Sequence, residues 1–228
     1  MPSTGNLLLD RMSAPDREAV IAIGQHVPFK VRDIVAEPER PIVNVYFVVE
    51  GILSSIAEME DGRRVETMMA GHDGLSGAMA ALVPATSYTL DTGQVDGSAW
   101  RVDAERLRAL CAERPGVRSV IADYVAGQHK ELAQSTACAA LHRSDQRLAK
   151  WLLRCHDRAR RDDLPLTQEY LAAMLGSQRT TVNEAMARLA ATGAVRNARG
   201  VVFVTDRSAL ERSACECYRR LPGPTETN

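Results

Sequence analysis

The segment that most constrains the fold spans residues 166–195 and reads LTQEYLAAMLGSQRTTVNEAMARLAATGAV. Thr167 is an N-cap residue type placed before a run with helical spacing, and Gly176 lies where a helix ends in a left-handed residue. After it, apolar residues recur at i, i+4 and i+7, namely Val182, Met186 and Leu189. Two short helices joined by a tight turn are therefore predicted, and Ser177 is expected to cap the second.

Three positions in this segment have a specific steric reason. Ala172 is small enough for the second helix to pass close, Gly176 makes the bend, and Val182 fills the angle between the helices. This combination is typical of the helix-turn-helix motif. An ordinary pair of packed helices is the alternative that the spacing leaves open.

A short hairpin is predicted directly behind the two helices. The sequence AVRNARGVVFV gives a β-rich run, a turn at Arg199 and Gly200, and a second β-rich run. A hairpin in this place makes a winged module, and Arg196 and Arg199 are expected to meet phosphates.

With its apolar stripe turned inward, the second helix presents residue types that suit base edges. Arginine bonds guanine bidentately, asparagine bonds adenine, glutamate accepts from cytosine, and a threonine methyl group contacts thymine. Ser177, Gln178 and the helix N-terminus suit a backbone phosphate. Glu184 and Arg188 also fit a plain i, i+4 surface pair. The candidate DNA-binding residues are Thr167, Gln168, Ser177, Gln178, Arg179, Thr180, Thr181, Asn183, Glu184, Arg188, Arg196 and Arg199.

Residues 41–100 have the pattern of strands and turns. Seven of the 15 glycines lie in this stretch, and Asp61-Gly62 between two apolar runs is a strong hairpin signal. A β-barrel, roll or sandwich is predicted here, followed by helices, so the fold class is α+β.

A long helix is predicted from Val117 to about Leu141, after a break at Pro115-Gly116. Along it, residues at three- and four-residue steps define one seam: Ile121, Tyr124, Val125, Gln128, Leu132, Ser135, Ala139 and His142. Such a seam packs either on the helix's own domain or on the same helix of a second copy.

The predicted organisation has four parts. They are a β-roll at 1–116, a dimerisation helix and hinge at 117–143, a winged helix-turn-helix at 144–221, in which Ser144 caps the first helix, and a disordered tail at 222–228. Residues 1–143 hold 14 Lys and Arg against 19 Asp and Glu, whereas residues 144–228 hold 14 against 10. The second part is the one suited to a polyanion.

The five cysteines are widely scattered and are expected to be reduced thiols. Cys215-x-Cys217 is too short for a zinc site, because tetrahedral closure needs a second ligand pair, and the histidines offer none at a recognisable spacing. No metal site and no iron–sulfur cluster is therefore predicted. No apolar run is long enough to span a bilayer and the first residues contain no secretory signal, so a cytoplasmic protein without a membrane partner is expected.

Taken together, these segments resemble the Crp/Fnr family of bacterial transcription factors. VYFVVEGILSSIAEMEDGRRVETMMAGHDGLSG resembles the family's β-roll sensor, a cyclic-nucleotide-binding-like jelly roll. VRSVIADYVAGQHKELAQSTACAAL resembles its dimer helix, and the segment from DQRLAKWLLRCHDRA onward resembles its winged helix-turn-helix. The resemblance implies a transcriptional regulator that binds double-stranded DNA as a homodimer on a near-palindromic site, with RNA polymerase as a partner if it activates.

The sequence also departs from the family. Members that bind cyclic nucleotides have a Gly-Glu pair and an arginine phosphate clamp, but residues 71–97 contain neither Arg nor Lys. Cyclic AMP is therefore predicted not to bind, and no cofactor is identified. The N-terminal cysteine cluster of the oxygen-sensing members is missing. Thr180 and Glu184 replace the Glu and the second Arg of the cyclic-AMP receptor, so a different operator is expected.

Two other classes of function are alternatives. An enzyme is disfavoured, because GHDGLSG is not a dinucleotide-binding motif and no His/Asp pair is assignable to Ser76. A ligand-binding or signalling module whose helix-turn-helix contacts proteins is the alternative to a DNA reader.

Overall fold

The computed structural model describes residues 3–220, and the predicted tail at 222–228 lies outside them. Two compact units make up the chain. The first contains Met1–Ala57 and Met68–His129, and the second contains Glu58–Thr67 and Lys130–Asn228. The division falls inside the long helix, whereas the predicted boundary at 141–144 lies where that helix ends.

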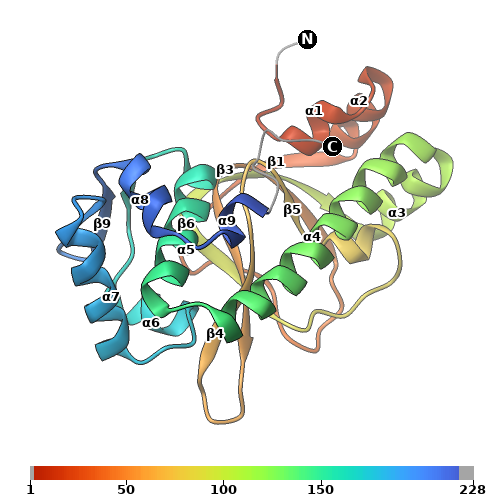
Figure 1. The fold of residues 1–228 in the computed structure, drawn as a ribbon. Coiled ribbons are helices and arrows are strands. Elements are labelled where there is room, and N and C mark those ends of the chain that lie inside the picture. Colours follow the sequence, from red (N-terminus) through yellow and green to blue (C-terminus); the bar gives the residue numbers. More distant parts are fainter. Residues whose placement is uncertain (1–2, 221–228) are drawn as a thin grey trace. The chain divides into compact units, whose positions relative to one another are not determined.

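Two short helices, α1 (Leu7–Arg11) and α2 (Ala14–Ala22), begin the first unit (Figure 1). The buried Asn6 caps α1 by accepting from the backbone N–H groups of Leu8 and Leu9. Its side-chain amide also donates to the carbonyls of Val48 and Gly74, at 2.7 and 2.8 Å. Because one buried side chain satisfies four backbone groups, it fixes α1 against the sheet.

The first unit is built on an antiparallel sheet, as the sequence predicted. Its path runs β1 (Gly24–Phe29), β6 (Leu90–Asp103), β3 (Asn44–Glu58), β4 (Arg64–Ala70), while β2 (Ile34–Ala36) pairs with β6 and β5 (Leu75–Ser76) pairs with β3. The predicted α+β class is confirmed, with strands first and most helices after them. The strands begin well before residue 41.

The β3–β4 hairpin has the predicted turn. Gly62 has φ +80° and donates to the Met59 carbonyl at 2.9 Å. The Asp61 carboxylate accepts from the Arg63 backbone N–H, and this side-chain hydrogen bond also stabilises the turn. The tip of this hairpin belongs to the second unit.

Helix α3 (Ala104–Glu113) follows β6 directly, and its N-cap Asp103 accepts from the Arg106 N–H. Together with the 3-10 turn η1 (Ala78–Ala81), it covers the main core of the first unit. The largest fully buried side chains of this core include Phe47, Leu9, Leu75, Leu107 and Ile121.

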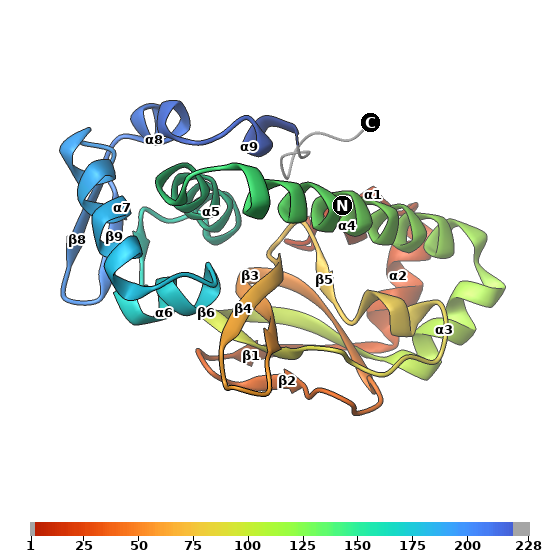
Figure 2. The same ribbon diagram turned by 60° about the horizontal axis from the view of Figure 1, so that its bottom comes forward.

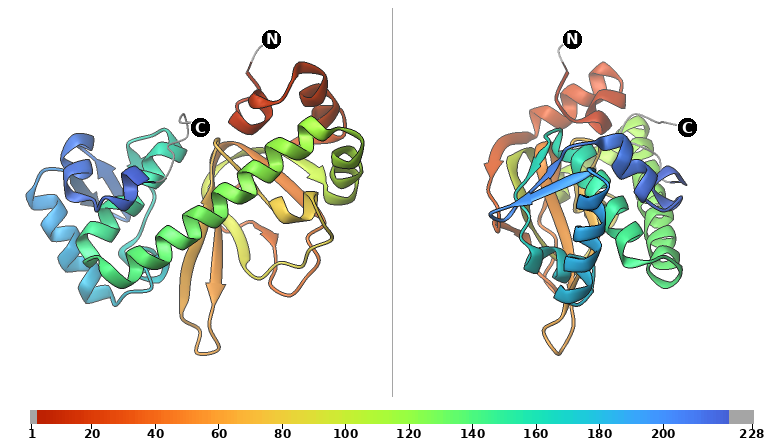
Figure 3. Two further views of the ribbon diagram at one scale, coloured as in Figure 1. Left: turned by 45° about the vertical axis from the view of Figure 1, so that its right-hand side comes forward. Right: turned by 60° about the vertical axis from the view of Figure 1, so that its left-hand side comes forward.

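The long helix α4 extends over Pro115–Leu141 and appears as a single rod in Figure 3. It begins two residues earlier than predicted, because proline is favoured in the first helical turn, where no N–H bond is needed. The helix break that was predicted at Pro115-Gly116 therefore lies one residue earlier, between the end of α3 and the start of α4.

The second unit contains α5 (Ser144–Ala159), β7 (Asp163–Leu164), α6 (Gln168–Met174), α7 (Arg179–Ala191), β8 (Val195–Ala198), β9 (Val201–Val204), α8 (Arg207–Ser213) and α9 (Cys217–Arg220) (Figure 2). The three strands form a small antiparallel sheet in the order β7-β9-β8. Ser144 is the first residue of α5 and not its cap: the Gln146 side chain accepts from the N–H of Arg143, which precedes the helix.

No helix within residues 3–220 combines the length and the apolar character needed to cross a membrane.

Candidate nucleic-acid interface

The turn between α6 and α7 is set by Gly176, which has φ +58°. Its N–H donates to the Ala173 carbonyl and the Ser177 N–H donates to the Ala172 carbonyl, both at 3.0 Å, the pattern of a Schellman motif. The turn spans four residues, 175–178. Ser177 was predicted to cap α7, and this prediction is wrong. Its hydroxyl instead donates back to the Leu175 carbonyl at 3.3 Å. Gln178 precedes α7 without a side-chain cap.

Helix α7 is held in place by the apolar face that the spacing predicted. Val182, Met186 and Leu189 are at most 3% exposed, and Ala185 is also buried. Ala172 on α6 is buried as well, so the small residue lies where the two helices pack, as expected. This packing fixes which residues of α7 face outward.

The outward face of α7 consists of Arg179, Thr180, Asn183, Glu184 and Arg188, all exposed. Within the described residues, no side chain pairs with the Arg179 guanidinium. Because α7 has no side-chain cap, the N–H groups of its first turn are open to an external acceptor, and this end of the helix favours an anion. Arg179, Thr181 (partly buried) and the exposed Gln178 surround this end.

Arg188 is held by carboxylates on two sides. Its guanidinium lies 3.3 Å from Asp145 on α5 and 4.0 Å from Glu184 one turn earlier. Although partial burial acts to raise it, the pKa of Asp145 is lowered by Arg143 and by Arg188. The i, i+4 pair that the sequence left open is thus present, and Arg188 is more constrained than Arg179.

The wing has the predicted hairpin. Arg199 and Gly200 have φ +50° and +80°, as a two-residue turn with both central residues left-handed requires. Arg199 is exposed at the tip, and the Arg196 guanidinium lies 4.0 Å from the centre of the Phe203 ring on the opposite strand. Stacking of this kind presents the guanidinium edge to solvent, where a phosphate can bind it.

Thr167 and Gln168 lie at the start of α6. The Thr167 hydroxyl accepts from the Tyr170 N–H at 3.1 Å and so caps α6, as predicted. Its oxygen is therefore occupied in holding the motif together, while Gln168 is half-buried beside it.

Two contacts from α5 position the motif. The Arg147 guanidinium donates to the Leu175 carbonyl at 2.8 Å, which satisfies an orphan acceptor at the end of α6. The Trp151 indole N–H donates to the Glu66 carboxylate of the β3–β4 hairpin at 2.6 Å. These two hydrogen bonds were not predicted from the sequence, because they join residues 28 and 85 positions apart that only the fold brings together.

Helix α5 is joined to the end of α4 by buried ion pairs. The Glu131 carboxylate bonds Arg154 closely and lies 3.7 Å from Arg158. The side chains of the two arginines are only 8% and 7% exposed. Such a cluster is costly to break, because its two guanidinium groups are largely out of water, although the Glu131 side chain is 21% exposed.

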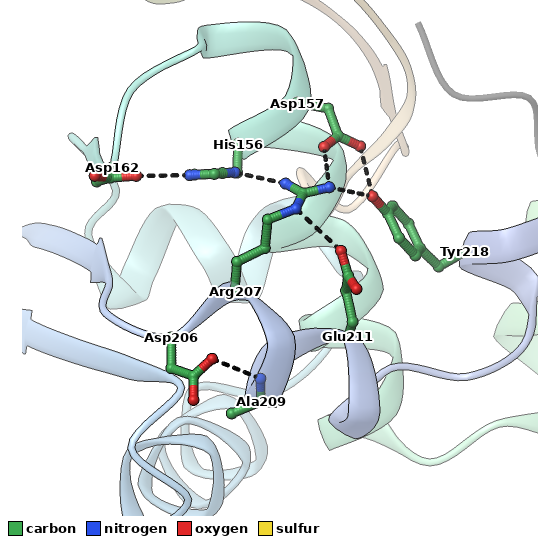
Figure 4. A network of polar contacts seen from close by, with 8 residues as sticks. All are labelled: His156, Asp157, Asp162, Asp206, Arg207, Ala209, Glu211 and Tyr218. Carbon is green, nitrogen blue, oxygen red and sulfur yellow. Dashed lines mark hydrogen bonds and ion pairs between the residues drawn. The ribbon is translucent and has the colours of Figure 1, made fainter. Parts of the chain in front are cut away.

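The C-terminal helices are fixed to α5 by the network in Figure 4. The Arg207 guanidinium bonds Asp157 and the Tyr218 hydroxyl at 2.7 Å each, and Glu211 at 3.0 Å. It also lies 2.7 Å from His156, which in turn bonds Asp162. Burial and the nearby Asp157 raise the pKa of Tyr218 to about 12, so this hydroxyl stays protonated and donates to Asp157.

One part of the second unit contradicts the sequence argument. Cys215-x-Cys217 was expected to lack a second ligand pair, but Cys138 in the last turn of α4 and His142 directly after that helix bring their Sγ and imidazole atoms within 4.8 Å of it. The expectation was wrong because the second pair lies more than 70 positions before Cys215 in the chain and meets it only in the folded structure. Burial and the neighbouring Cys138 raise the pKa of the Cys215 thiol to about 12.

Comparisons with known proteins agree with the geometry. Residues 146–213 match the Crp-like helix-turn-helix domain. The chain is 27% identical over 188 residues to the CRP-like cAMP-activated global transcriptional regulator of Mycobacterium tuberculosis, a match that covers 79% of this chain and 84% of that protein.

Solved structures share the fold. A CRP/FNR-family transcriptional regulator from Thermus thermophilus is 22% identical with a TM-score of 0.70, covering 83% of this chain and 98% of the other. FixK2 from Bradyrhizobium japonicum is 18% identical with a TM-score of 0.70, covering 85% and 98%. The global regulator CLP from Xanthomonas campestris, described as responsive to c-di-GMP, is 18% identical with a TM-score of 0.69, covering 85% and 100%.

Proposed function

We propose that this chain, a DNA-binding transcription regulator of the Crp/Fnr type, acts as a homodimer on a near-palindromic DNA site. Two copies of α7 would then enter successive major grooves about 34 Å apart. The observation that supports this most is the face of α7: a buried apolar stripe fixes the helix, while its uncapped first turn and exposed polar side chains point outward.

The proposed dimer contact is the solvent-facing side of α4. Ile121 is fully buried, the Tyr124 hydroxyl donates to the Leu75 carbonyl and Gln128 donates to Tyr124, so these three pack on their own unit. Ser135 is half-buried. The seam that we assign to the second copy has alternating three- and four-residue steps: Ala122, Val125, His129, Leu132, Thr136 and Ala139. All of these are exposed except Val125, which also packs against the core of its own unit. It retains Val125, Leu132 and Ala139 from the seam predicted by sequence.

Specific reading would rest mainly on Arg179, Thr180, Asn183 and Glu184, with Arg188 held in place by Asp145. Phosphate contacts would come from the α7 N-terminus with Ser177, Gln178 and Thr181, from Thr167 and Gln168 beside it, and from the wing arginines Arg196 and Arg199. Residues 144–228 hold 14 Lys and Arg against 10 Asp and Glu, so the module is positive although α7 is not.

Arg179→Ala tests the reading role directly. We expect it to weaken binding to the preferred site by roughly 5- to 150-fold, or about 1–3 kcal/mol, and to relax the preference at one base position. The measurement is a titration of labelled duplexes that carry each base at every position.

Arg212→Ala is the matched control, since it removes the same charge from α8, where Arg212 is 71% exposed. It should weaken binding slightly and equally for all sequences, with the base preferences unchanged. Binding of duplex by the wild-type chain should also fall steeply as salt rises, because phosphate contacts release counterions. If no duplex binds at low salt, a module that contacts proteins through its helix-turn-helix becomes the better reading.

We further propose that the β-roll does not bind cyclic AMP. Residues 71–97 offer no cation for a cyclic phosphate, and their buried Asp91 accepts from Ser76 and Thr89 at 2.7 and 2.8 Å. Calorimetry that detects tight cyclic-AMP binding would overturn this proposal.

The buried Asp91 predicts how the stability of the roll depends on pH. Burial raises its pKa, against the hydrogen bonds from Ser76 and Thr89. The folded state therefore holds this proton more tightly than the unfolded state, and the free energy of unfolding should fall as pH rises from about 4 through the folded pKa. Asp91→Asn should flatten this slope in denaturant titrations over a pH series. An unchanged slope would mean that Asp91 does not titrate in this window.

The remaining parts of the proposal follow from DNA binding. The chain would act in the bacterial cytoplasm, contact RNA polymerase if it activates, and carry no catalytic activity. Ser76 does pair with Asp91, a pair that the sequence argument missed, but this buried pair has the features of a structural contact and not of a nucleophile. The β-roll would be a sensor of another signal or a constitutive scaffold.

A further inference from the structure

Four side chains with metal-ligand atoms converge on one point of the second unit. Cys138 lies in the last turn of α4 and His142 directly follows that helix, while Cys217 begins α9 and Cys215 lies two residues before it. The Cys138 and Cys215 sulfur atoms lie 3.6 Å apart, and the Cys217 sulfur lies 3.6 Å from Nδ1 of His142. All four ligand atoms lie within 4.8 Å of one another.

The two separations of 3.6 Å agree with the edges of a single tetrahedral site, and the other pairs, which lie within 4.8 Å, would draw together when an ion binds. With Zn–S bonds of about 2.3 Å and Zn–N bonds of about 2.0–2.1 Å, the edges of a tetrahedron are about 3.8 Å between sulfurs and about 3.6 Å between sulfur and nitrogen. A disulfide would instead need sulfurs about 2.05 Å apart. An iron–sulfur cluster separates its ligand sulfurs more widely than one ion does.

The groups around the four ligands are those that a metal site uses. Nε2 of His142 lies 3.2 Å from the Glu216 carboxylate, while Nδ1 faces Cys217. A ligating histidine usually donates its second N–H to a carboxylate in this way, which fixes the ring and its tautomer. The Gln134 amide donates to the Cys217 sulfur at 3.0 Å, so this sulfur also has a hydrogen-bond donor beside it.

Burial indicates what kind of site this is. The three cysteines are at most 3% exposed and form an apolar cluster of their own, separate from the cores of the chain. Four protein ligands close a tetrahedral shell and leave no position for a substrate, which is typical of structural zinc. Three sulfurs and an imidazole also suit zinc better than they suit magnesium or calcium.

We propose that Cys138, His142, Cys215 and Cys217 bind one zinc ion, and that this ion joins the two ends of the DNA-binding module. Binding converts three thiols to thiolates and releases their protons to solvent. His142 lies two residues before α5, the first helix of the module, and Cys215 lies two residues after α8. A metal link between these points closes a loop that contains the whole winged helix-turn-helix, and so removes entropy from its unfolded state.

The first experiment measures metal in the full chain, purified under reducing conditions without chelator. Elemental analysis should find about one zinc per chain, and Cys217→Ser and Cys138→Ser should each reduce this to less than about one-tenth. Cys111→Ala is the matched control, because Cys111 is equally buried but lies in the core of the first unit. It should retain the zinc. Zinc that persists in both cluster variants would overturn the proposal.

A second measurement does not depend on whether the variants fold. Cobalt(II) titrated into the wild-type chain, after a chelator has removed the zinc, should produce the visible absorption of a tetrahedral thiolate site at one equivalent. Glu216→Gln, a change in a positioning residue that is mostly exposed, should weaken zinc affinity by about 10- to 100-fold. Absence of the cobalt signal would show that the cluster is not a zinc site.

Discussion

Replacing Glu131 by alanine should lower the free energy of unfolding of the second unit by about 3–5 kcal/mol. The Glu131 carboxylate lies between Arg154 and Arg158, whose side chains are 8% and 7% exposed. Its removal leaves two buried guanidinium groups without this counter-charge, and buried charges are costly when their partner is lost. Denaturant unfolding followed by Trp151 fluorescence, in a Trp100→Phe background, reports on this unit alone.

Glu58→Ala is the control for this measurement, because Glu58 belongs to the same unit but forms an exposed pair with Arg64. It should cost less than about 1 kcal/mol. Equal effects of the two substitutions would mean that the Glu131 cluster does not anchor α5 to α4.

The second large effect concerns the dimer. Introducing Ala122→Glu together with Leu132→Glu places like charges on the exposed side of α4, where Leu132 is 36% exposed. We expect a monomer in analytical ultracentrifugation at micromolar concentration, because each charge would face apolar groups of the second copy. Affinity for a duplex with two half-sites should fall by about 10²- to 10⁴-fold, since the second half-site no longer gains from linkage to the first.

Lys130→Glu serves as the comparison for this variant, because Lys130 is exposed on α4 but outside the proposed seam. It should remain a dimer with a modest loss of DNA affinity. A dimer that survives Ala122→Glu with Leu132→Glu would place the contact between copies elsewhere.

Local rules in the sequence predicted much of the fold. Gly176, Thr167 and the Asp61-Gly62 turn each act within a few residues, so their roles were readable without knowledge of the tertiary structure. The stripe of α7 was readable for the same reason. Short-range signals thus gave the helix-turn-helix, the wing and the β3–β4 hairpin.

Features that depend on tertiary placement were not readable. The seam on α4 mixed residues that face the unit's own core, such as Ile121, with residues that face solvent, such as Leu132, because three- and four-residue steps occur on both sides of a helix. The hydroxyl of Ser177 had a nearer carbonyl to bond and so left α7 uncapped. The cysteine cluster joins positions 77 apart in the chain, and only the folded structure brings them together.

Three polar contacts join the helices of the second unit. Glu131 ties α5 to α4, Arg207 ties the C-terminal helices to α5, and Arg147 fixes the turn before α7. The proposed zinc site would add a link between the two ends of the module. None of these contacts uses a side chain of the exposed face of α7. The loss of any one of them should therefore reduce stability first and change base preference little.

In the proposed dimer, α7 reads DNA in two symmetrically related copies. Selection of bound duplexes from a random pool by the full chain tests this most directly. We expect enrichment of a near-palindromic motif whose half-site centres lie about 10–10.5 base pairs apart, with one position in each half relaxed when Arg179→Ala is selected in parallel. A pool that stays unenriched, or a motif without inverted repeats, would show that two copies of α7 do not read DNA in this way.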